Sequence, residues 1–293
     1  MRILAATDFS TRSSRALRRA GLLAQAQGAE LALIHVVDDD QPQDLIRLES
    51  REAERILAEQ ISAMAELRGA RCRPMVVADD PFNGILRAAG SIEADLVVMG
   101  AHRKQLLRDI FVGTTVERVI RTGPYPVLMV NHEVKQPYRN VLVAVDVSEP
   151  SANAIRAAAS AGLIGDRVVT FLHAFFPLGK GKLVEARIDQ PAIDKYVASE
   201  RQRAADELVA FLEANGFGDL KATLHVEEGE SFAVISQAVA EMRSDLLILG
   251  THGRTGLLKA LLGSVTEEAL RRLDVDILAV PPAVRSPPEN AKA

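Results

Sequence analysis

The chain has 293 residues, of which 48% are hydrophobic and 25% charged, enough for two soluble domains of about 150 residues each. A net charge of −4 and an aromatic content of 4% argue against a nucleic-acid partner. No apolar run approaches the roughly 18 residues of a membrane-spanning helix, and an acidic residue at position 8 comes too early for a signal peptide. The single cysteine, Cys72, fits a reducing compartment. We therefore expect a cytoplasmic protein without a membrane partner.

Two stretches of the chain recur later in the sequence. Residues 3–10 match residues 141–148 at an offset of 138 (146 − 8), and residues 95–100 match residues 245–250 at an offset of 150 (250 − 100). The second copy therefore contains a net 12 extra residues (150 − 138) between its two ends. We predict one domain at 1–137, a second at 138–285 and a disordered tail at 286–293, with the polar segment 131–137 as the linker.

Each copy shows the same succession of elements. It begins with a short aliphatic and β-branched run, which is typical of a strand buried on both faces of a parallel sheet. In copy one we expect a helix at 13–27, a strand ending at 37, a long helix at 43–67, a strand at 73–78 and a last strand at 127–130. In copy two we expect a helix at 151–163, a strand ending at 175, a long helix at 192–214, a strand at 221–227 and a last strand at 277–280.

This alternation of strands and helices predicts βαβ units with right-handed crossovers. The expected fold class is α/β, with two tandem Rossmann-like, doubly wound domains. Each domain has a five-stranded parallel sheet flanked by helices. Ligands of such sheets bind beyond the carboxyl ends of the strands, at the point where the strand order reverses.

A glycine-rich stretch after the fourth strand of copy two is the sharpest chemical signal. It consists of Gly250 and Gly253, followed after nine residues by Gly263 and Ser264. Glycines let backbone N–H groups approach a phosphate without a Cβ in the way. A helix N-terminus after Gly263 adds free amides and a positive dipole end, and Ser264 adds a hydroxyl. A competing interpretation needs no ligand: residues 264–267 and 114–117 both have the pattern of a helix capping box.

The spacing G-x2-G-x9-G-[S/T] resembles the ATP-binding signature of the universal stress protein family, in its nucleotide-binding branch. The turn Asp146-Val147-Ser148 after the first strand and the last strand of copy one, Pro126 to Val130, are also similar to that family. The resemblance covers nearly the whole chain, twice over. The complete signature is fairly specific, whereas each fragment alone is weak.

The resemblance implies a role for each matching position. Asp146 lies near the adenosine, and the backbone of Ala174 faces the adenine. The implied phosphate and ribose contacts are Gly250, Gly253, Gly263, Ser264 and Val265, with His252 at the pocket rim. The weaker corresponding set in copy one is Asp8, Val36, Gly100, Arg103, Gly113, Thr114 and Thr115. Arg103 replaces the second glycine, so we expect copy one to bind weakly or not at all.

Other residues are given structural interpretations. His102 and His252 have no carboxylate or nucleophile nearby in sequence, so we interpret them as pocket-rim histidines. His35 and His173, which end strands, are structural or rim residues. Gly179 to Lys182 lacks the P-loop spacing and is interpreted as an exposed loop. A metal held by Asp8 or Asp146 is the weaker alternative to helix capping, because one carboxylate is a poor cation site.

The expected function is that of a stress-response protein which binds ATP, mainly in the second domain, as a nucleotide-dependent regulator or sensor. ADP and AMP stay open, with Mg²⁺ accompanying the phosphates, and any hydrolysis is expected to be slow. The resemblance also implies that the domains pair through their last strands, here as an intramolecular pseudo-dimer, with a homodimer of chains as a further option. The alternatives are a structural or interaction module without productive nucleotide binding and, ranked last, an adenylating enzyme.

Overall fold

The three-dimensional structure is a computed structural model, which describes residues 1–101, 114–165, 167–253 and 262–282. The predictions that fall on His102, Arg103, Gly113 and the tail at 286–293 lie outside these residues. No helix within the described ranges is long and apolar enough to cross a lipid bilayer.

The described elements follow the expected alternation. The strands of the first half are β1 (Arg2–Ala6), β2 (Glu30–Val37), β3 (Arg71–Ala78), β4 (Leu96–Gly100) and β5 (Val127–Val130). Its helices are α1 (Thr11–Gln27), α2 (Gln43–Ala63), α3 (Ala65–Arg68), α4 (Pro81–Ser91) and α5 (Thr115–Thr122). The strands of the second half are β6 (Asn140–Ala144), β7 (Val168–Phe175), β8 (Ala222–Glu228), β9 (Leu246–Gly250) and β10 (Asp276–Val280). Its helices are α6 (Glu149–Ser160), α7 (Lys180–Glu185), α8 (Gln190–Ala214), α9 (Ser231–Glu241) and α10 (Ser264–Arg272).

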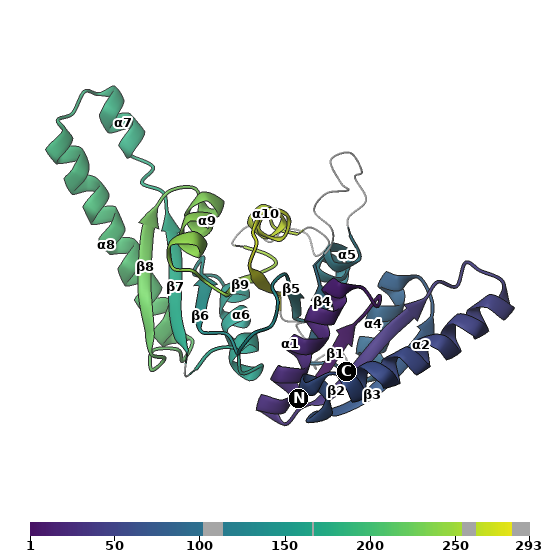
Figure 1. The fold of residues 1–293 in the computed structure, drawn as a ribbon. Helices are drawn as coiled ribbons and strands as arrows, with labels where there is room; N and C mark the ends of the chain where they lie inside the picture. The colour runs from purple at the N-terminus through teal and green to yellow at the C-terminus, as the bar shows by residue number, and fades with distance from the viewer. Residues whose placement is uncertain (102–113, 166, 254–261, 283–293) are drawn as a thin grey trace, which may run out of the picture.

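The strands form one continuous sheet in the order β3-β2-β1-β4-β5-β10-β9-β6-β7-β8 (Figure 1). Within each half the pairing is parallel, which confirms the predicted doubly wound α/β class. The halves meet at β5 and β10, which pair antiparallel with Leu128 opposite Leu278. The last strands therefore pair inside one chain, as the family resemblance implied. Each of these two strands is an open edge of its own half-sheet, and their pairing covers both edges.

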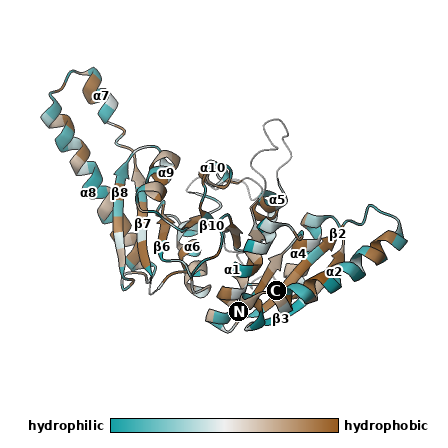
Figure 2. Cartoon of the chain, in the orientation of Figure 1, coloured by the Kyte–Doolittle hydropathy of each residue, from teal (hydrophilic) through white to brown (hydrophobic). Residues whose placement is uncertain are grey.

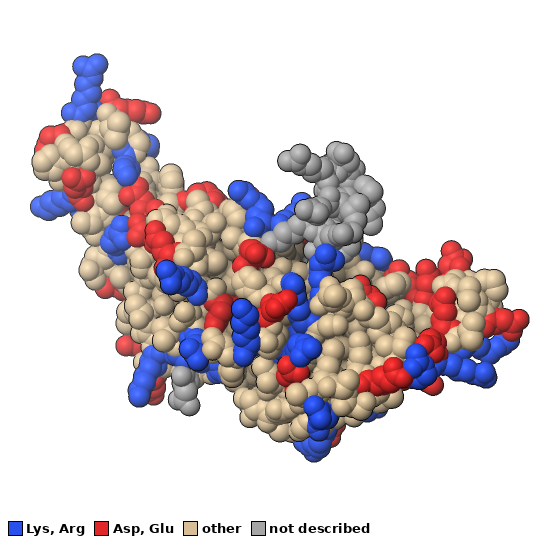
Figure 3. Space-filling view, in the orientation of Figure 1, with Lys and Arg blue, Asp and Glu red and all other residues tan. Residues whose placement is uncertain are grey.

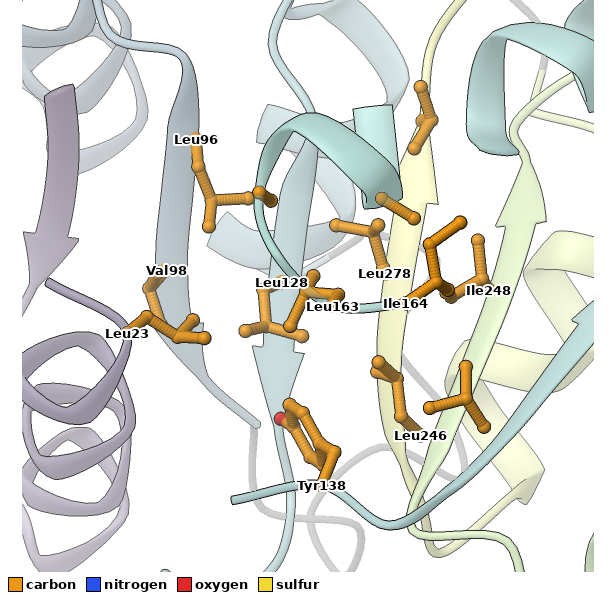
Figure 4. Close-up of a cluster of buried hydrophobic side chains, with 14 of the residues drawn as sticks. Leu23, Leu96, Val98, Leu128, Tyr138, Leu163, Ile164, Leu246, Ile248 and Leu278 are labelled. Atoms are coloured by element: carbon orange, nitrogen blue, oxygen red, sulfur yellow. The ribbon is translucent and has the colours of Figure 1, made fainter. Parts of the chain in front are cut away.

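The sheet separates two apolar layers that run through both halves. One face is covered by α1, α2, α6 and α8 and includes the fully buried Leu17, Ile155 and Leu208. The other face is covered by α4, α5, α9 and α10. Figure 4 shows that the first layer continues across the junction, where Leu128 and Leu278 lie between side chains of both halves. Apolar residues line the strands while the outer helix faces are polar (Figure 2).

A buried carboxylate ties the halves together at the start of β10. Asp276 has no exposed surface. Its Oδ1 accepts from the backbone N–H groups of Asn131 and His132, at 2.8 and 3.0 Å, and its Oδ2 accepts from the Tyr138 hydroxyl at 2.6 Å. The Asn131 side chain also donates to the Val275 carbonyl at 2.6 Å. The amides at the start of the predicted linker and the Tyr138 hydroxyl just after its end thus satisfy a charge that would otherwise be costly to bury.

Arg19 in α1 completes the cluster of groups around Asp276. Its Nε lies 3.7 Å from Asp276 Oδ2, and its guanidinium stacks 3.7 Å above the centre of the Tyr138 ring. It also donates to the Gln136 carbonyl at 2.9 Å. Burial raises the pKa of Tyr138 well above its usual value, and the Asp276 charge raises it further, so the phenol remains a hydrogen-bond donor. Helix α1 of the first half is thereby joined to β10 of the second.

Two local expectations need correction, and a third is made more specific. The long helix expected at 43–67 is interrupted at Met64, whose extended ψ of 122° separates α2 from α3. The segment after Gly179 is not a plain loop, because Lys180 begins the short helix α7. The third concerns the extra residues of copy two. Most of them lie before α8, where 14 residues separate β7 from α8, against five between β2 and α2.

Cys72 has a structural position in the sheet. It lies in β3 opposite Leu31 and packs against the buried layer beneath α1. Burial raises the pKa of its thiol to about 11, so the reactive thiolate is scarce at neutral pH.

Replacing Asp276 tests the junction. Asp276→Asn removes the charge that two amides, a phenol and Arg19 share. We expect the free energy of unfolding to fall by about 3 kcal/mol, because a buried guanidinium loses its counter-charge. Urea denaturation measures this. The control is Asp274→Asn, with the side chain of Asp274 77% exposed, for which a change below about 0.5 kcal/mol is expected. Equal effects of the two substitutions would contradict a special role of Asp276.

Candidate functional site

A pocket opens at the carboxyl ends of the second half's strands, where neighbouring β6 and β9 lead to crossovers on opposite sides. All of the residues predicted for this half line it, together with side chains from α9 and the start of α6. The predicted residues in its wall are Asp146, Ala174, Gly250, His252, Gly253, Gly263, Ser264 and Val265. Positions more than a hundred residues apart in sequence are therefore brought to one hollow.

Two serine hydroxyls hold the acidic residue of this pocket. Asp146 Oδ1 accepts from Ser148 Oγ and from Ser151 Oγ, the latter at 2.6 Å. Between Asp146 and Ser148 the chain passes through Val147, whose φ of 51° is left-handed and rare for a β-branched residue. The first half has the same turn at Phe9, with φ 62°. Strained backbone at the same place in both copies marks a turn that the surrounding structure holds in shape.

Gly253 lies beside the Asp146 carboxylate. A Cβ at position 253 would be 2.9 Å from Asp146 Oδ2, so any other residue would displace that side chain. Gly250 has a different reason to be glycine, because a Cβ there would be 3.2 Å from the Pro150 carbonyl oxygen in α6. Glycine at 250 thus allows β9 to pack against α6, whereas glycine at 253 keeps the pocket wall open.

Helix α10 begins in a way that the capping-box interpretation did not anticipate. Gly263 is the N-cap, Ser264 is the first helical residue, and no side chain among the described residues caps the helix. The Gly263 N–H donates to the Thr251 carbonyl at 2.8 Å, which fixes the extended backbone before the helix. The capping box predicted at 264–267 is therefore wrong, and the Ser264 hydroxyl has no capping role.

The first turn of α10 faces the pocket. Ser264, Val265 and Thr266 line the hollow, and their N–H groups have no acceptor within the helix, as at any helix N-terminus. The Thr266 hydroxyl donates to the Gly250 carbonyl at 2.9 Å and so holds the helix against the end of β9. A helix start with free amides in a concave wall is suited to an anion.

His252 adds a polar atom to the wall. Its Nδ1 lies 2.9 Å from Thr251 Oγ1, while its Nε2 is buried without a hydrogen-bond partner among the described residues. A neutral ring that accepts from the Thr251 hydroxyl carries its proton on Nε2. A buried donor of this kind is costly unless a ligand supplies an acceptor.

The first half has a similar pocket at the equivalent place. Its wall includes Asp8, Val36, Gly100, Thr114 and Thr115. The hollow measures about 360 Å³, against about 250 Å³ in the second half. Arg103 and Gly113 lie outside the described residues, so the expected weakening by Arg103 stays a prediction.

Helix α5 of the first half differs from α10 at its start. Thr114 accepts from the Glu117 N–H at 3.2 Å, and the Glu117 side chain accepts from the Thr114 N–H at 3.3 Å. This capping box confirms the interpretation made for residues 114–117. The hydroxyl at this position is therefore engaged in the first half and not in the second.

The strand-ending histidines are structural, as expected. His35 Nδ1 lies 2.9 Å from the Thr7 carbonyl oxygen, and His173 Nδ1 lies 2.7 Å from the Val145 carbonyl oxygen. The His35 ring also stacks on Phe9, with centroids 4.2 Å apart. Each ring thus fixes the turn that carries the pocket carboxylate.

Neither carboxylate caps a helix, because the N-caps of α1 and α6 are Ser10 and Ser148. Burial by itself would raise the pKa of Asp8, but hydrogen bonds from Ser10 and Ser13 outweigh it and lower that pKa below its usual value. Among the described residues no group of three or more His, Cys, Asp or Glu gathers where it could hold a metal ion.

The sequence profile of the universal stress protein family matches the chain twice, over residues 1–131 and 137–281. The chain belongs to the universal stress protein family. A solved relative, a universal stress protein from Archaeoglobus fulgidus, superposes with a TM-score of 0.71 over 96% of this chain and 98% of that one, at 20% identity. At that identity the likeness concerns the fold.

Curated universal stress proteins match parts of the chain. Universal stress protein E of Escherichia coli K12 is 27% identical over 209 residues, which cover 69% of this chain and 65% of that protein. The chain thus spans slightly less than two thirds of that relative's length. A universal stress protein of Thermus aquaticus is 32% identical over 135 residues, which cover 44% of this chain and 96% of that protein.

Sequence reasoning missed several pocket residues of this universal stress protein. Ser151 lines the pocket and, together with Ser148, holds Asp146. Both serines had a signal in the repeat, because Ser10 and Ser13 occupy the same positions in copy one. Arg12 lines the first pocket, where copy two has a proline at position 150. Nothing local in the sequence distinguishes such an arginine from a solvent-exposed one, since the direction of its side chain depends on the fold.

The two helix starts predict different effects of hydroxyl removal. Thr114→Ala should lower the free energy of unfolding by about 1 kcal/mol, because it removes a cap. Ser264→Ala should leave stability within about 0.5 kcal/mol, because Ser264 caps nothing. Thermal or urea denaturation of the two variants, side by side, measures both. A loss for Ser264→Ala as large as that for Thr114→Ala would show that Ser264 stabilises the helix after all.

Proposed function

We propose that this universal stress protein binds ATP in its second half and acts as a nucleotide-dependent regulator or sensor. The observation that carries the proposal is the pocket beneath α10, in which the glycines, the free amides and the uncommitted Ser264 hydroxyl meet. The space beside Gly253, the amides at the start of α10 and the Ser264 hydroxyl are each suited to a phosphate.

The residues present fit the parts of the nucleotide. The amides of the first turn of α10, with the Ser264 hydroxyl, are the donors for the phosphates. Gly253 leaves room beside them, since any Cβ there would collide with Asp146 Oδ2. Asp146 is the acceptor for ribose hydroxyls. A Mg²⁺ ion that accompanies the phosphates is held chiefly by the nucleotide and not by protein side chains.

The base lies toward β7 in this proposal. Ala174 is in the pocket wall near the end of β7, and apolar side chains of Leu172 and Ile235 flank it. Backbone groups of a strand end read the edge of an adenine through its N–H and ring nitrogen. Guanine presents the opposite pattern of donor and acceptor at that edge, so the pocket should favour adenine.

The connection from the pocket to the other half supports a regulatory role. The Thr251 N–H, beside the pocket, donates to the Val280 carbonyl at the end of β10 at 2.8 Å. Strand β10 in turn pairs with β5 of the first half and starts at the buried Asp276. A ligand bound beside Thr251 acts one strand from the β5–β10 junction. A change in the packing of the two halves at that junction is visible to a partner protein. No activated nucleophile is part of the proposal, and turnover is expected to be slow.

Gly253→Arg tests the pocket. The substitution places a side chain where the Asp146 carboxylate lies and should abolish ATP binding by the second half while the fold survives. Isothermal titration calorimetry measures affinity and stoichiometry, and far-UV circular dichroism checks the fold. The matched variant is Arg103→Gly in the first half, which should raise the number of ATP molecules bound per chain. Unchanged ATP affinity of Gly253→Arg would refute the assigned loop, and two equal sites in the unmodified chain would contradict a weak first half.

The identity of the ligand is tested on the purified protein. After denaturation, chromatography of the released small molecules should identify an adenine nucleotide, at up to one per chain. Protein stripped of ligand should bind ATP at least about tenfold more tightly than GTP, a difference equal to one good hydrogen bond to the base. Equal affinity for GTP would contradict the adenine pocket. Failure to bind any nucleotide would favour an interaction module of the same family.

A further inference from the structure

One carboxylate stands between the two halves, on the face of the sheet that α5 and α10 cover. The side chain of Glu117, in the first turn of α5, is only 12% exposed. Its Oε2 accepts from the Thr114 N–H at 3.3 Å, and its Oε1 lies 3.4 Å from Nε of Arg271, in the last turn of α10. Figure 3 shows basic and acidic groups together over this part of the molecule. A side chain of the first half is therefore held both by its own helix and by a cation of the second half.

The same arginine also binds within the second half. Arg271 Nη2 lies 2.9 Å from Glu267 Oε1, one turn earlier in α10. Glu267 directly follows residues 264–266, which line the second pocket. A continuous series of polar contacts thus leads from the helix start in the second pocket, through Glu267, Arg271 and Glu117, to the helix start in the first pocket.

The repeat shows that this sharing is unequal. An offset of 150 relates Glu117 to Glu267 and Arg121 to Arg271 (267 − 117 and 271 − 121), so a symmetric junction would contain two ion pairs between the halves. Within the described part of the chain only one of them is present, the pair of Arg271 with Glu117. Two carboxylates, one from each half, therefore share a single guanidinium.

Glu117 is held loosely by both of its donors. Hydrogen bonds from N–H groups to a carboxylate are usually about 2.7–2.9 Å long, whereas its two contacts measure 3.3 and 3.4 Å. The contact of Arg271 with Glu267 is shorter, at 2.9 Å. The Arg271 side chain is 54% exposed and so has room to shift. A small movement of this guanidinium decides which donor holds Glu117.

A nucleotide in the second pocket changes this balance, a step that rests on the function proposed above. Phosphates at the start of α10 add negative charge on the side of Glu267, which attracts Arg271 toward its own helix. Glu117 then has a weaker hold on the guanidinium and a stronger one on the Thr114 N–H. The cap of α5 tightens as a result.

We propose that Glu117 and Arg271 couple the two pockets, so that ATP bound beside α10 tightens the cap of α5 in the wall of the first pocket. Thr114 lines that pocket, and its N–H is then withdrawn from an anion there. Coupling between binding sites is reciprocal. An anion that takes the Thr114 N–H therefore releases Glu117 to Arg271 and weakens ATP binding in the second half. The start of α5 thereby reports whether the second pocket is occupied.

Hydrogen exchange of the full chain, measured by mass spectrometry with and without saturating ATP, tests the coupling. ATP should slow the exchange of the amides of residues 114–117 by about fivefold, the lower end of the usual range for coupled sites. Arg271→Met and Glu117→Gln should each abolish this protection while ATP, added to saturation, still binds. Glutamine at position 117 keeps an acceptor for the Thr114 N–H, so its effect isolates the lost charge.

Arg272→Met is the matched control. Arg272 pairs with Glu268 at 2.7 Å, in the same i,i+4 arrangement as Arg271 with Glu267, and its guanidinium lies over Phe232 of the second half. This variant should keep the full protection. Gly253→Arg, which loses ATP from the second pocket, should show none. Protection that persists in Gly253→Arg would come from ATP in the first pocket itself and would overturn the proposal.

Calorimetry on the same samples separates this coupling from the function on which it rests. ATP binding without protection of residues 114–117 would overturn the coupling and leave nucleotide binding intact. Protection that survives Arg271→Met and Glu117→Gln, or that is lost equally in Arg272→Met, would have the same consequence. A chain that binds no ATP would overturn both proposals.

Discussion

The antiparallel pairing of β5 with β10 is the contact on which the rest of the molecule depends. It joins two parallel half-sheets, covers the edge strand of each, and lets one apolar layer run beneath both. Asp276 stands at the start of β10, where its buried charge is satisfied only when the linker amides and Tyr138 are in place. Because hydrogen bonds to a buried charge are strong and its isolation is costly, this cluster selects one arrangement of the halves.

The two pockets share a plan and differ in one detail of helix capping. Both lie where the strand order reverses, and both contain a strained turn with a carboxylate held by serines. In the first half Thr114 closes its helix with a capping box, whereas α10 starts behind Gly263 and leaves Ser264 uncommitted. A hydroxyl that satisfies the backbone is less available to a ligand. The halves have thus diverged in the role of the hydroxyl at the start of this helix.

The insertion of the second copy illustrates how a repeated fold gains a separate surface. The strands, helices and pocket of the second half keep their places although additional residues enter between β7 and α8. The insertion extends outward from the carboxyl edge and is anchored at Lys180 and Gly179. Surface connections tolerate such additions because their backbone is solvated and crosses no packed layer. The asymmetry between the two ends of the molecule arises there.

The sequence by itself determined the repeat, the α/β class and eight of the residues that line the second pocket. These follow from local signals: strand–helix periodicity, and glycines whose spacing resembles the family signature. The tertiary structure decided the role of Asp276, the start of α10 at Ser264 and the exposure of apolar side chains in residues 176–189. Each depends on groups distant in sequence: Asp276 meets Asn131 and Tyr138, and Gly263 binds the Thr251 carbonyl. A linear pattern specifies what each segment prefers, but which buried groups satisfy one another is settled only when the strands are side by side.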